Sequence, residues 1–272
     1  MVRIACVQPE VFQETNKCYL EIEKIIKELF TKFDFCDLIC LPERWVPLTN
    51  GKELNVQKER GKNYKFIKNL AKEYNVCIIS GAIWEKRQSS NKPRITSYFF
   101  DNYGEELGRQ DKIHLYSYER KNFESGEELL LFSSKKINFA ILICFDMAFF
   151  ETPRLAAENG ANILFSPTQI RAEGMENWET YLKARALENR IPVAACNTYG
   201  RLLKSKFPGH SKIISFVKDF ISPSKLRIVE GPIESSGYIC DNLDLMFPKK
   251  LRKLRFKETI EKSEINVRKV DF

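Results

Sequence analysis

Short apolar runs typical of β-strands recur along the whole chain, and stretches with helical periodicity separate them. The expected strands cover residues 2–8, 37–42, 76–84, 95–101, 105–111, 137–143, 162–166, 192–197, 211–217, 225–230 and 237–241. The expected helices cover residues 17–32, 60–74, 151–159 and 177–190. Mostly apolar strands with helices between them indicate sheets that helices cover. Eleven strands are many for one sheet, so two sheets packed on each other with helices outside suit the pattern better.

Length and composition predict one domain over residues 1–272. The 272 residues, 43% of them hydrophobic, suffice for one large core or at most two small ones. No Pro/Gly/Ser-rich linker or repeat interrupts the chain. No stretch approaches the roughly 20 apolar residues of a membrane span, and the N-terminus starts a strand rather than a signal peptide. We therefore expect a cytoplasmic protein without a membrane partner.

The positive charge is concentrated at the C-terminal end. The net charge is +8, and residues 245–272 hold nine Lys or Arg against four Asp or Glu. A basic stretch of this kind predicts a solvated helix and tail. Little aromatic interleaving and no nucleic-acid motif accompany it, so we expect no nucleic-acid partner.

The eight cysteines lack the spacing of a metal site. No C-x-x-C occurs, so no zinc site is expected. Most of them lie in apolar runs, which predicts packed, reduced thiols, while a disulfide between distant strands stays open. The cysteines are at positions 6, 18, 36, 40, 77, 144, 196 and 240.

Three reactive side chains follow the ends of expected strands. Cys144 ends the run 137–143, Glu43 follows Leu-Pro at the end of the run 37–42, and Lys112 follows the run 105–111. A free thiol has a pKa near 8.5 and needs a base or a cation to act as a nucleophile at neutral pH. A carboxylate and an ammonium at matching positions supply both.

These segments, in order, resemble the carbon–nitrogen hydrolase (nitrilase) superfamily. The matching motifs are RIACVQP at 3–9, LPE at 41–43, KIHL at 112–115, YERKNFESG at 118–126, ICFD at 143–146 and KARALEN at 183–189, and the resemblance fades after FPGHS at 207–211. The resemblance implies an α/β fold, a four-layer α-β-β-α sandwich. It also implies a Glu-Lys-Cys triad that works without a metal or organic cofactor.

The resemblance assigns a role to each of these residues. Cys144 is the nucleophile, and Glu43 is the general base. Lys112 stabilises the oxyanion together with the backbone N–H of Phe145, and its charge favours the thiolate. Glu119 has an accessory, positioning role. The product of the first half-reaction is a thioester, which water then hydrolyses.

A cysteine–histidine dyad is the competing arrangement. His114 is near Lys112 in sequence, but no cysteine-protease flank accompanies Cys144. We expect His114 to form a structural hydrogen bond instead.

Apolar and aromatic residues near the motifs are the expected walls of the substrate pocket, because loops after strand ends usually line it. They are Trp45, Phe149, Gln169, Ile170 and Trp178. Arg171 and Arg185 are candidate anchors for a substrate carboxylate. Phe150 stands where the superfamily usually has proline, which brings a bulky aromatic near the pocket.

The residues after the nucleophile favour amide hydrolysis. Nitrile-cleaving members usually have Trp-Glu there, whereas this chain has Phe145 and Asp146. We expect hydrolysis of a small-molecule amide, with N-carbamoyl compounds or nitriles as alternative substrates. A non-catalytic interaction protein on the same fold is the alternative from another class. The resemblance also implies a homo-oligomer.

Overall fold

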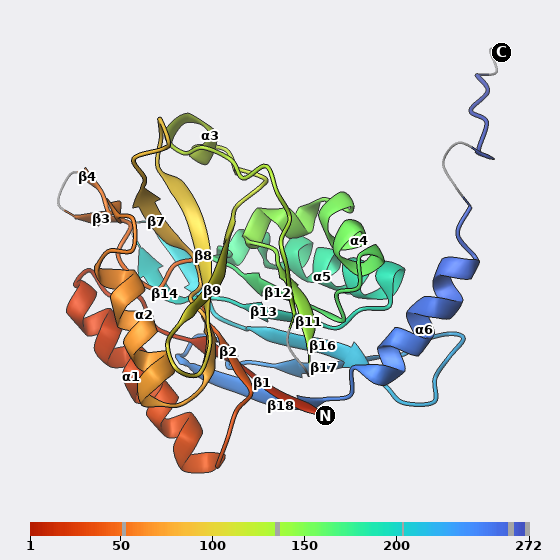
Figure 1. The fold of residues 1–272 in the computed structure, drawn as a ribbon, viewed down its shortest axis with the longest axis horizontal. Coiled ribbons are helices and arrows are strands. Elements are labelled where there is room, and N and C mark those ends of the chain that lie inside the picture. The colour runs from red at the N-terminus through yellow and green to blue at the C-terminus, as the bar shows by residue number, and fades with distance from the viewer. Residues whose placement is uncertain (51–52, 134–136, 203, 261–263, 270–272) are drawn as a thin grey trace.

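The computed structural model describes residues 1–50, 53–133, 137–202, 204–260 and 264–269 (Figure 1). The helices are α1 (Thr15–Lys32), α2 (Lys62–Glu73), α3 (Glu119–Asn122), α4 (Glu151–Glu158), α5 (Met175–Asn189) and α6 (Met246–Lys257), with 3₁₀ turns at Cys144–Ala148 and Ala172–Gly174. The strands are β1 (Val2–Gln8), β2 (Leu38–Cys40), β3 (Thr49–Asn50), β4 (Glu53–Leu54), β5 (Gln57–Lys58), β6 (Cys77–Ile79), β7 (Ile83–Lys86), β8 (Arg94–Phe100), β9 (Glu106–Asp111), β10 (Leu131–Ser133), β11 (Asn138–Ile141), β12 (Ile163–Pro167), β13 (Val193–Cys196), β14 (Tyr199–Leu202), β15 (Ser205–Pro208), β16 (Lys212–Phe216), β17 (Leu226–Glu230) and β18 (Gly237–Leu243).

The long strands form two sheets. The first has the order β18-β1-β2-β6-β8-β7-β5, with β9 also paired to β8, and the second has the order β10-β11-β12-β13-β16-β17. Strands β1, β2 and β6 run parallel, as do β11, β12 and β13. The carboxyl ends of each parallel set therefore lie at one edge of its sheet, where connecting loops gather.

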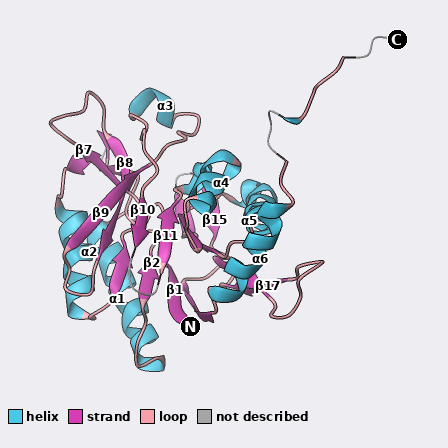
Figure 2. Cartoon of the chain, turned by 45° about the vertical axis from the view of Figure 1, so that its right-hand side comes forward, coloured by secondary structure: helices cyan, strands magenta, loops and turns pink. Residues whose placement is uncertain are grey.

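The side-chain alternation of β1 shows how the layers are built. Ile4 and Cys6 face the second sheet, whereas Ala5 and Val7 face α1 and α2. On the opposite side of the molecule α4 and α5 cover the outer face of the second sheet (Figure 2). The molecule is thus an α-β-β-α sandwich, as the sequence predicts.

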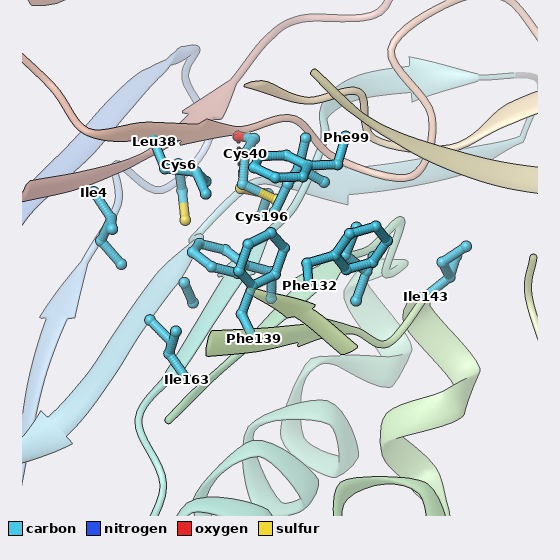
Figure 3. Close-up of a cluster of buried hydrophobic side chains, with 14 of the residues drawn as sticks. Ile4, Cys6, Leu38, Cys40, Phe99, Phe132, Phe139, Ile143, Ile163 and Cys196 are labelled. Carbon is cyan, nitrogen blue, oxygen red and sulfur yellow. Dashed lines mark hydrogen bonds between the residues drawn. The ribbon is translucent and has the colours of Figure 1, made fainter. Parts of the chain in front are cut away.

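Aromatic rings fill the space between the two sheets. Phe139 on β11 is fully buried, and its ring lies 4.9 Å from that of Phe99, 5.2 Å from that of Phe132 and 5.3 Å from that of Phe165. Figure 3 shows Phe99, Phe132 and Phe139 near three buried cysteines, Cys6, Cys40 and Cys196. These cysteines are free, as are the other five.

The expected strand 76–84 is two strands, β6 and β7. Gly81 lies between them with φ +71°, and a Cβ on it would come within 2.1 Å of the carbonyl oxygen of Pro42. Only glycine permits both this conformation and this contact. The break therefore brings the loop that follows β2, which carries Glu43, against the β6–β7 connection.

The C-terminal basic segment is a helix that packs on the body over part of its length. Leu251 and Arg252 of α6 are buried, and the Arg252 guanidinium donates a hydrogen bond of 2.5 Å to the carbonyl oxygen of Ala161. The prediction of a solvated helix is wrong for this face. The described residues after α6 run away from the body, and residues 261–263 and 270–272 of the predicted tail lie outside the described residues (Figure 1). Within the described chain, no helix has the length and apolar character to span a membrane.

Candidate active site

Glu43 is at the carboxyl end of the first sheet, where that sheet meets the second. It follows β2 by three residues, and its backbone N–H donates to the carbonyl oxygen of Thr168, which follows β12 of the other sheet. The distance is 3.1 Å. The hydroxyl of Thr198 donates to the carbonyl oxygen of Arg44, the next residue along the loop. Both sheets therefore hold the loop that presents the carboxylate.

Lys112 lies between two carboxylates. It directly follows β9, and its Nζ is 2.7 Å from Oε1 of Glu43 and 2.8 Å from Oε2 of Glu119. All three side chains are buried. Glu119 also accepts a hydrogen bond from the backbone N–H of Tyr116 at 2.7 Å. The lysine is therefore held by two acceptors at a buried position.

Cys144 starts the 3₁₀ turn that follows β11, with a backbone φ of +48°. A non-glycine residue in this region carries conformational strain, which is common at functional sites. Asp146 holds the turn in place, because its carboxylate accepts the backbone N–H of Ile143 at 2.9 Å and that of His114 at 2.7 Å. The same carboxylate thus ties the Cys144 turn to the segment that carries Lys112.

A cavity of about 840 Å³ exposes these groups together. Its walls come from the loops after β2, β9, β11 and β12 and from α5 and the β14–β15 hairpin. They include Glu43, Arg44, Trp84, Lys112, Tyr116, Tyr118, Glu119, Cys144, Phe145, Gln169, Ile170, Arg171, Trp178, Tyr181 and Phe207. The described residues contain no group of three or more His, Cys, Asp or Glu arranged to hold a metal ion.

The resting thiol of Cys144 is neutral. Burial raises its pKa well above the usual value, and the Glu43 carboxylate raises the pKa further, while Lys112 and the backbone N–H of Gln169 act in the opposite direction. The expectation that Lys112 favours the thiolate is therefore right in sign but outweighed. A neutral thiol must lose its proton during attack, and Glu43 is a carboxylate that lines the same cavity.

The charges around Lys112 support the same arrangement. Burial disfavours the charged ammonium of Lys112, but the carboxylates outweigh this effect and raise its pKa well above the usual value. Burial raises the pKa of Glu119, although Lys112 opposes the rise. Lys112 is therefore a fixed positive charge between the two carboxylates.

The expected pocket residues divide into two groups. Gln169, Ile170 and Trp178 line the cavity. Trp45 does not, because its ring packs on the helix side of the first sheet, 5.9 Å from the ring of Phe66, and its Nε1 donates to the carbonyl oxygen of Ser80. Phe149 lines a neighbouring hollow, where its ring stacks on His114 at 4.1 Å.

His114 forms a structural hydrogen bond and no dyad. Its Nδ1 is 3.0 Å from Oδ1 of Asp146, and the described chain shows no hydrogen bond between His114 and Cys144. Arg185, one of the expected anchors, also has a structural role, because its Nε donates to the carbonyl oxygen of Met147 at 3.1 Å. Of the two expected anchors, only Arg171 faces the cavity.

Sequence reasoning missed Arg44 and the tyrosines of the cavity wall. Arg44 is 3% exposed, and Tyr116 and Tyr118 follow Lys112 within six residues. Tyr118 belongs to a motif of the resemblance, so its neighbourhood was recognisable. Arg44 directly follows Glu43, and this adjacency could have suggested that Arg44 also lines the cavity.

Comparisons with known proteins find relatives over most of the chain. The model of the carbon-nitrogen hydrolase family matches residues 3–222. A probable nitrilase of Schizosaccharomyces pombe is 32% identical over 259 residues, which cover 92% of this chain and 91% of the relative. A 2-oxoglutaramate amidase of Bacillus subtilis is 32% identical over 221 residues, covering 78% of this chain and 82% of the relative.

The fold is also that of solved structures. Nit3 of Saccharomyces cerevisiae, a member of branch 10 of the nitrilase superfamily, superposes with a TM-score of 0.79 at 22% identity, covering 93% of both chains. The chain therefore belongs to the carbon-nitrogen hydrolase family, the nitrilase superfamily, and is a carbon–nitrogen hydrolase.

Proposed function

We propose that this enzyme hydrolyses a small-molecule amide through a thioester on Cys144 and releases ammonia and a carboxylic acid. The observation that carries the proposal is the position of Lys112, whose Nζ lies 2.7 Å from Glu43 inside the cavity that also exposes Cys144. A nucleophile, a base and a fixed positive charge on one cavity wall are the set that acyl transfer requires.

The first half-reaction follows from the protonation states. Cys144 Sγ attacks the amide carbon while its proton passes to the Glu43 carboxylate, because the thiol is neutral at rest. Lys112 and the backbone N–H of Phe145 stabilise the oxyanion. Glu43 then gives the proton to the nitrogen as the carbon–nitrogen bond breaks. Ammonia leaves, and the thioester remains.

The second half-reaction repeats the proton transfer with water. Glu43 takes a proton from water as the oxygen attacks the thioester carbon, and the proton returns to Sγ as the thiolate leaves. Glu119 is a positioning residue in both half-reactions. It holds Lys112 at 2.8 Å and takes no part in the proton transfers. No added oxidant, reductant or metal is needed for the atoms to balance.

The residues that follow Cys144 and one of the relatives both favour an amide. Phe145 and Asp146 differ from the Trp-Glu of nitrile-cleaving members, and one relative is a 2-oxoglutaramate amidase. N-carbamoyl compounds and nitriles remain the alternative substrates within the same chemistry.

Ammonia release tests the proposal. Wild type is compared with Cys144→Ala on a panel of aliphatic and aromatic amides, ω-amides, N-carbamoyl compounds and nitriles. Cys77→Ala is a matched control, since Cys77 is also a partly exposed free cysteine but lies on β6 and does not line the cavity. We expect release by wild type and by Cys77→Ala alone, with an amide as the best substrate. If folded wild-type protein releases no ammonia from any compound of the panel, the alternative of a non-catalytic interaction protein is favoured.

We also propose a homo-oligomer. The helices that cover the second sheet expose apolar side chains to solvent, among them Leu155 of α4 at 49% and Tyr181 of α5 at 37%. Light scattering tests this proposal, and a monomeric mass across the concentration range of the assay would contradict it.

A further inference from the structure

Two cysteine thiols flank strand β1 on its helix-covered face. Cys36 lies in the loop between α1 and β2, and its Sγ donates to the carbonyl oxygen of Arg3 on β1 at 3.5 Å. Cys240 is on β18, where it pairs with Ala5 of β1. Ala5, Cys36 and Cys240 all pack on the helix side of the first sheet. Because the side chain of Ala5 ends at Cβ, it leaves room for the two thiols to meet across β1.

The two thiols act on each other. A side-chain hydrogen bond from Cys36 lowers the pKa of Cys240 and raises the pKa of Cys36. Burial and Asp241 oppose the fall in the pKa of Cys240, whereas the positive charges of Arg3 and Lys32 support it. A thiol that donates to its neighbour stabilises that neighbour as a thiolate, so Cys240 is the more acidic thiol of the pair.

Cys240 is also the accessible thiol of the pair. It is partly exposed on β18, the edge strand of the first sheet, whereas Cys36 is buried (Figure 1). The other partly exposed cysteines are Cys77 and Cys144, and burial raises the pKa of both. An accessible thiol of lowered pKa beside a second thiol is the arrangement that peroxides oxidise to a disulfide.

We propose that Cys36 and Cys240 form a modification site, at which a hydroperoxide converts the two thiols to a disulfide across β1. The sulfur of Cys240 attacks the peroxide, so an S–O bond forms as the O–O bond breaks. A sulfenic acid on Cys240 remains, and an alcohol or water leaves. The sulfur of Cys36 then attacks the sulfur of Cys240. The S–S bond forms as the S–O bond breaks, and the hydroxide leaves as water with the proton of Cys36.

The electrons balance in this sequence, because the peroxide accepts the two electrons that the thiols lose. A dithiol reductant reverses the modification by thiol–disulfide exchange. Cys36 and Cys240 lie outside the catalytic cavity, so the modification does not depend on the proposed function.

Three other cysteines provide an internal control. Cys6, Cys40 and Cys196 lie between the two sheets and are 0% exposed (Figure 3). They are also close together, since Sγ of Cys196 donates to the carbonyl oxygen of Cys40 at 2.9 Å. Burial raises the pKa of Cys40 and of Cys196. Proximity without access or acidity predicts that these thiols stay reduced while the protein is folded.

Peptide mapping without reduction, after treatment of the folded protein with hydrogen peroxide at pH 7, tests the proposal. We expect a crosslink between the peptides that carry Cys36 and Cys240, lost on treatment with dithiothreitol. Trypsin leaves Cys36 and Cys40 on one peptide, so fragment ions that separate them assign the bond. The same map in Cys144→Ala shows that the catalytic cysteine takes no part.

Variants assign the two roles. Cys240→Ser abolishes the crosslink. Cys36→Ser stops the reaction at the sulfenic acid of Cys240, which dimedone traps. Cys77→Ser is the matched control, since Cys77 is a partly exposed cysteine of the same sheet, and its crosslink forms as in wild type.

Labelling by iodoacetamide at pH 7 measures the acidity of Cys240 directly. A thiol whose pKa is one unit lower has about tenfold more thiolate and loses about threefold in nucleophilicity. We therefore expect Cys240 to react at least about threefold faster than Cys77. A Cys240 that reacts no faster than Cys77 overturns its assignment as the attacking thiol.

Three results would overturn the modification site. They are a wild-type map without the crosslink at peroxide concentrations that oxidise Cys240, a disulfide that joins Cys240 of two copies of the chain, and a crosslink that forms only after unfolding in urea. If Cys36→Ser does not fold, the wild-type map and Cys240→Ser decide the question. Ammonia release plays no part in these measurements, so their failure leaves the proposed function untouched.

Discussion

Replacing Glu43 with glutamine is expected to change two properties of Cys144 in opposite directions. Glu43 raises the pKa of the Cys144 thiol through its negative charge, and it is also the proposed base that removes the thiol proton. The amide of glutamine removes the charge and the basicity together, yet it keeps an oxygen that accepts a hydrogen bond from Lys112. Glu119 still holds Lys112 at 2.8 Å, so the substitution leaves the lysine paired.

The size of the first change follows from the charge that is removed. A nearby charge shifts a pKa by about 1 to 3 units, so the thiolate population below the pKa rises about 10- to 1000-fold. The nucleophilicity of a thiolate falls as its pKa falls, with a slope near 0.5, so the net rate of alkylation rises about 3- to 30-fold. Turnover falls about 10²- to 10⁴-fold, which is the usual contribution of a general base.

Alkylation by iodoacetamide at pH 7, read at Cys144 by mass spectrometry, measures the first change, and ammonia release measures the second. Glu119→Gln is the control for charge alone, because Glu119 raises the pKa of Cys144 less than Glu43 does. We expect its alkylation rate to stay within about threefold of wild type. Alkylation of Glu43→Gln that slows together with turnover would refute the reasoning, because Glu43 would then activate the thiol at rest.

Three further predictions concern the framework of the site. Asp111→Asn removes a carboxylate bound to Arg87 at 2.6 Å and should lower the free energy of unfolding by about 3 kcal/mol at pH 7 in urea. Burial opposes the ionised form of Asp111, but Arg87 and Thr96 outweigh it and lower the pKa of this carboxyl group. The stabilisation by Asp111 is therefore present above the unfolded pKa near 3.9 and is lost as the pH falls through the lower folded pKa. A difference in stability between wild type and Asp111→Asn that grows in acid would contradict this. Asp146→Asn leaves one acceptor oxygen for the backbone N–H groups of His114 and Ile143. We expect kcat to fall at least about tenfold and the free energy of unfolding to fall by about 2 kcal/mol. An unchanged kcat would show that Asp146 does not position Cys144. Phe139→Ala should cost about 4 kcal/mol, because three rings contact it between the sheets, and a loss below about 1 kcal/mol in a denaturant titration would show that the core collapses around the gap.

The positions of the three reactive residues were predictable from sequence because Glu43 and Cys144 each follow an apolar run and Lys112 follows an expected strand. Residues that follow parallel strands lie in loops at the carboxyl ends of those strands, so Glu43 and Cys144 were each expected in such a loop. Their convergence was not predictable from local patterns. It depends on contacts between sheets, such as the hydrogen bond from Glu43 to Thr168, which joins residues far apart in the sequence.

The residues whose positions were predicted wrongly lie in irregular segments without the side-chain periodicity of a helix or a strand. Trp45 follows Pro42 in an irregular loop, so neither helical nor strand alternation could tell whether its ring faced the cavity or the helices. The short strands β3, β4 and β5 each have two residues, too few for alternation to appear. Gly81 was visible in the run 76–84, but its meaning depends on the approach of Pro42 from another loop.

Arg44 was missed for a different reason, which is that an arginine beside a loop is usually solvated. Its burial comes from Trp84 on β7, a strand about forty residues further along, and no local pattern reports such a contact. The burial of Arg44 is therefore the feature of the cavity least accessible from sequence, since it depends on a tertiary contact.

A neutral resting thiol limits the charge that the buried site must hold. Lys112 lies 2.7 Å from Glu43 and 2.8 Å from Glu119, and burial raises the pKa of the Cys144 thiol, so the thiol adds no further negative charge beside these groups. In the proposed attack the proton moves from sulfur to Glu43 while the oxyanion forms beside Lys112. The proposed step therefore creates no net charge in a medium where an unpaired charge is costly. A resting thiolate would instead add a negative charge before substrate arrives, and the burial of Cys144 opposes it.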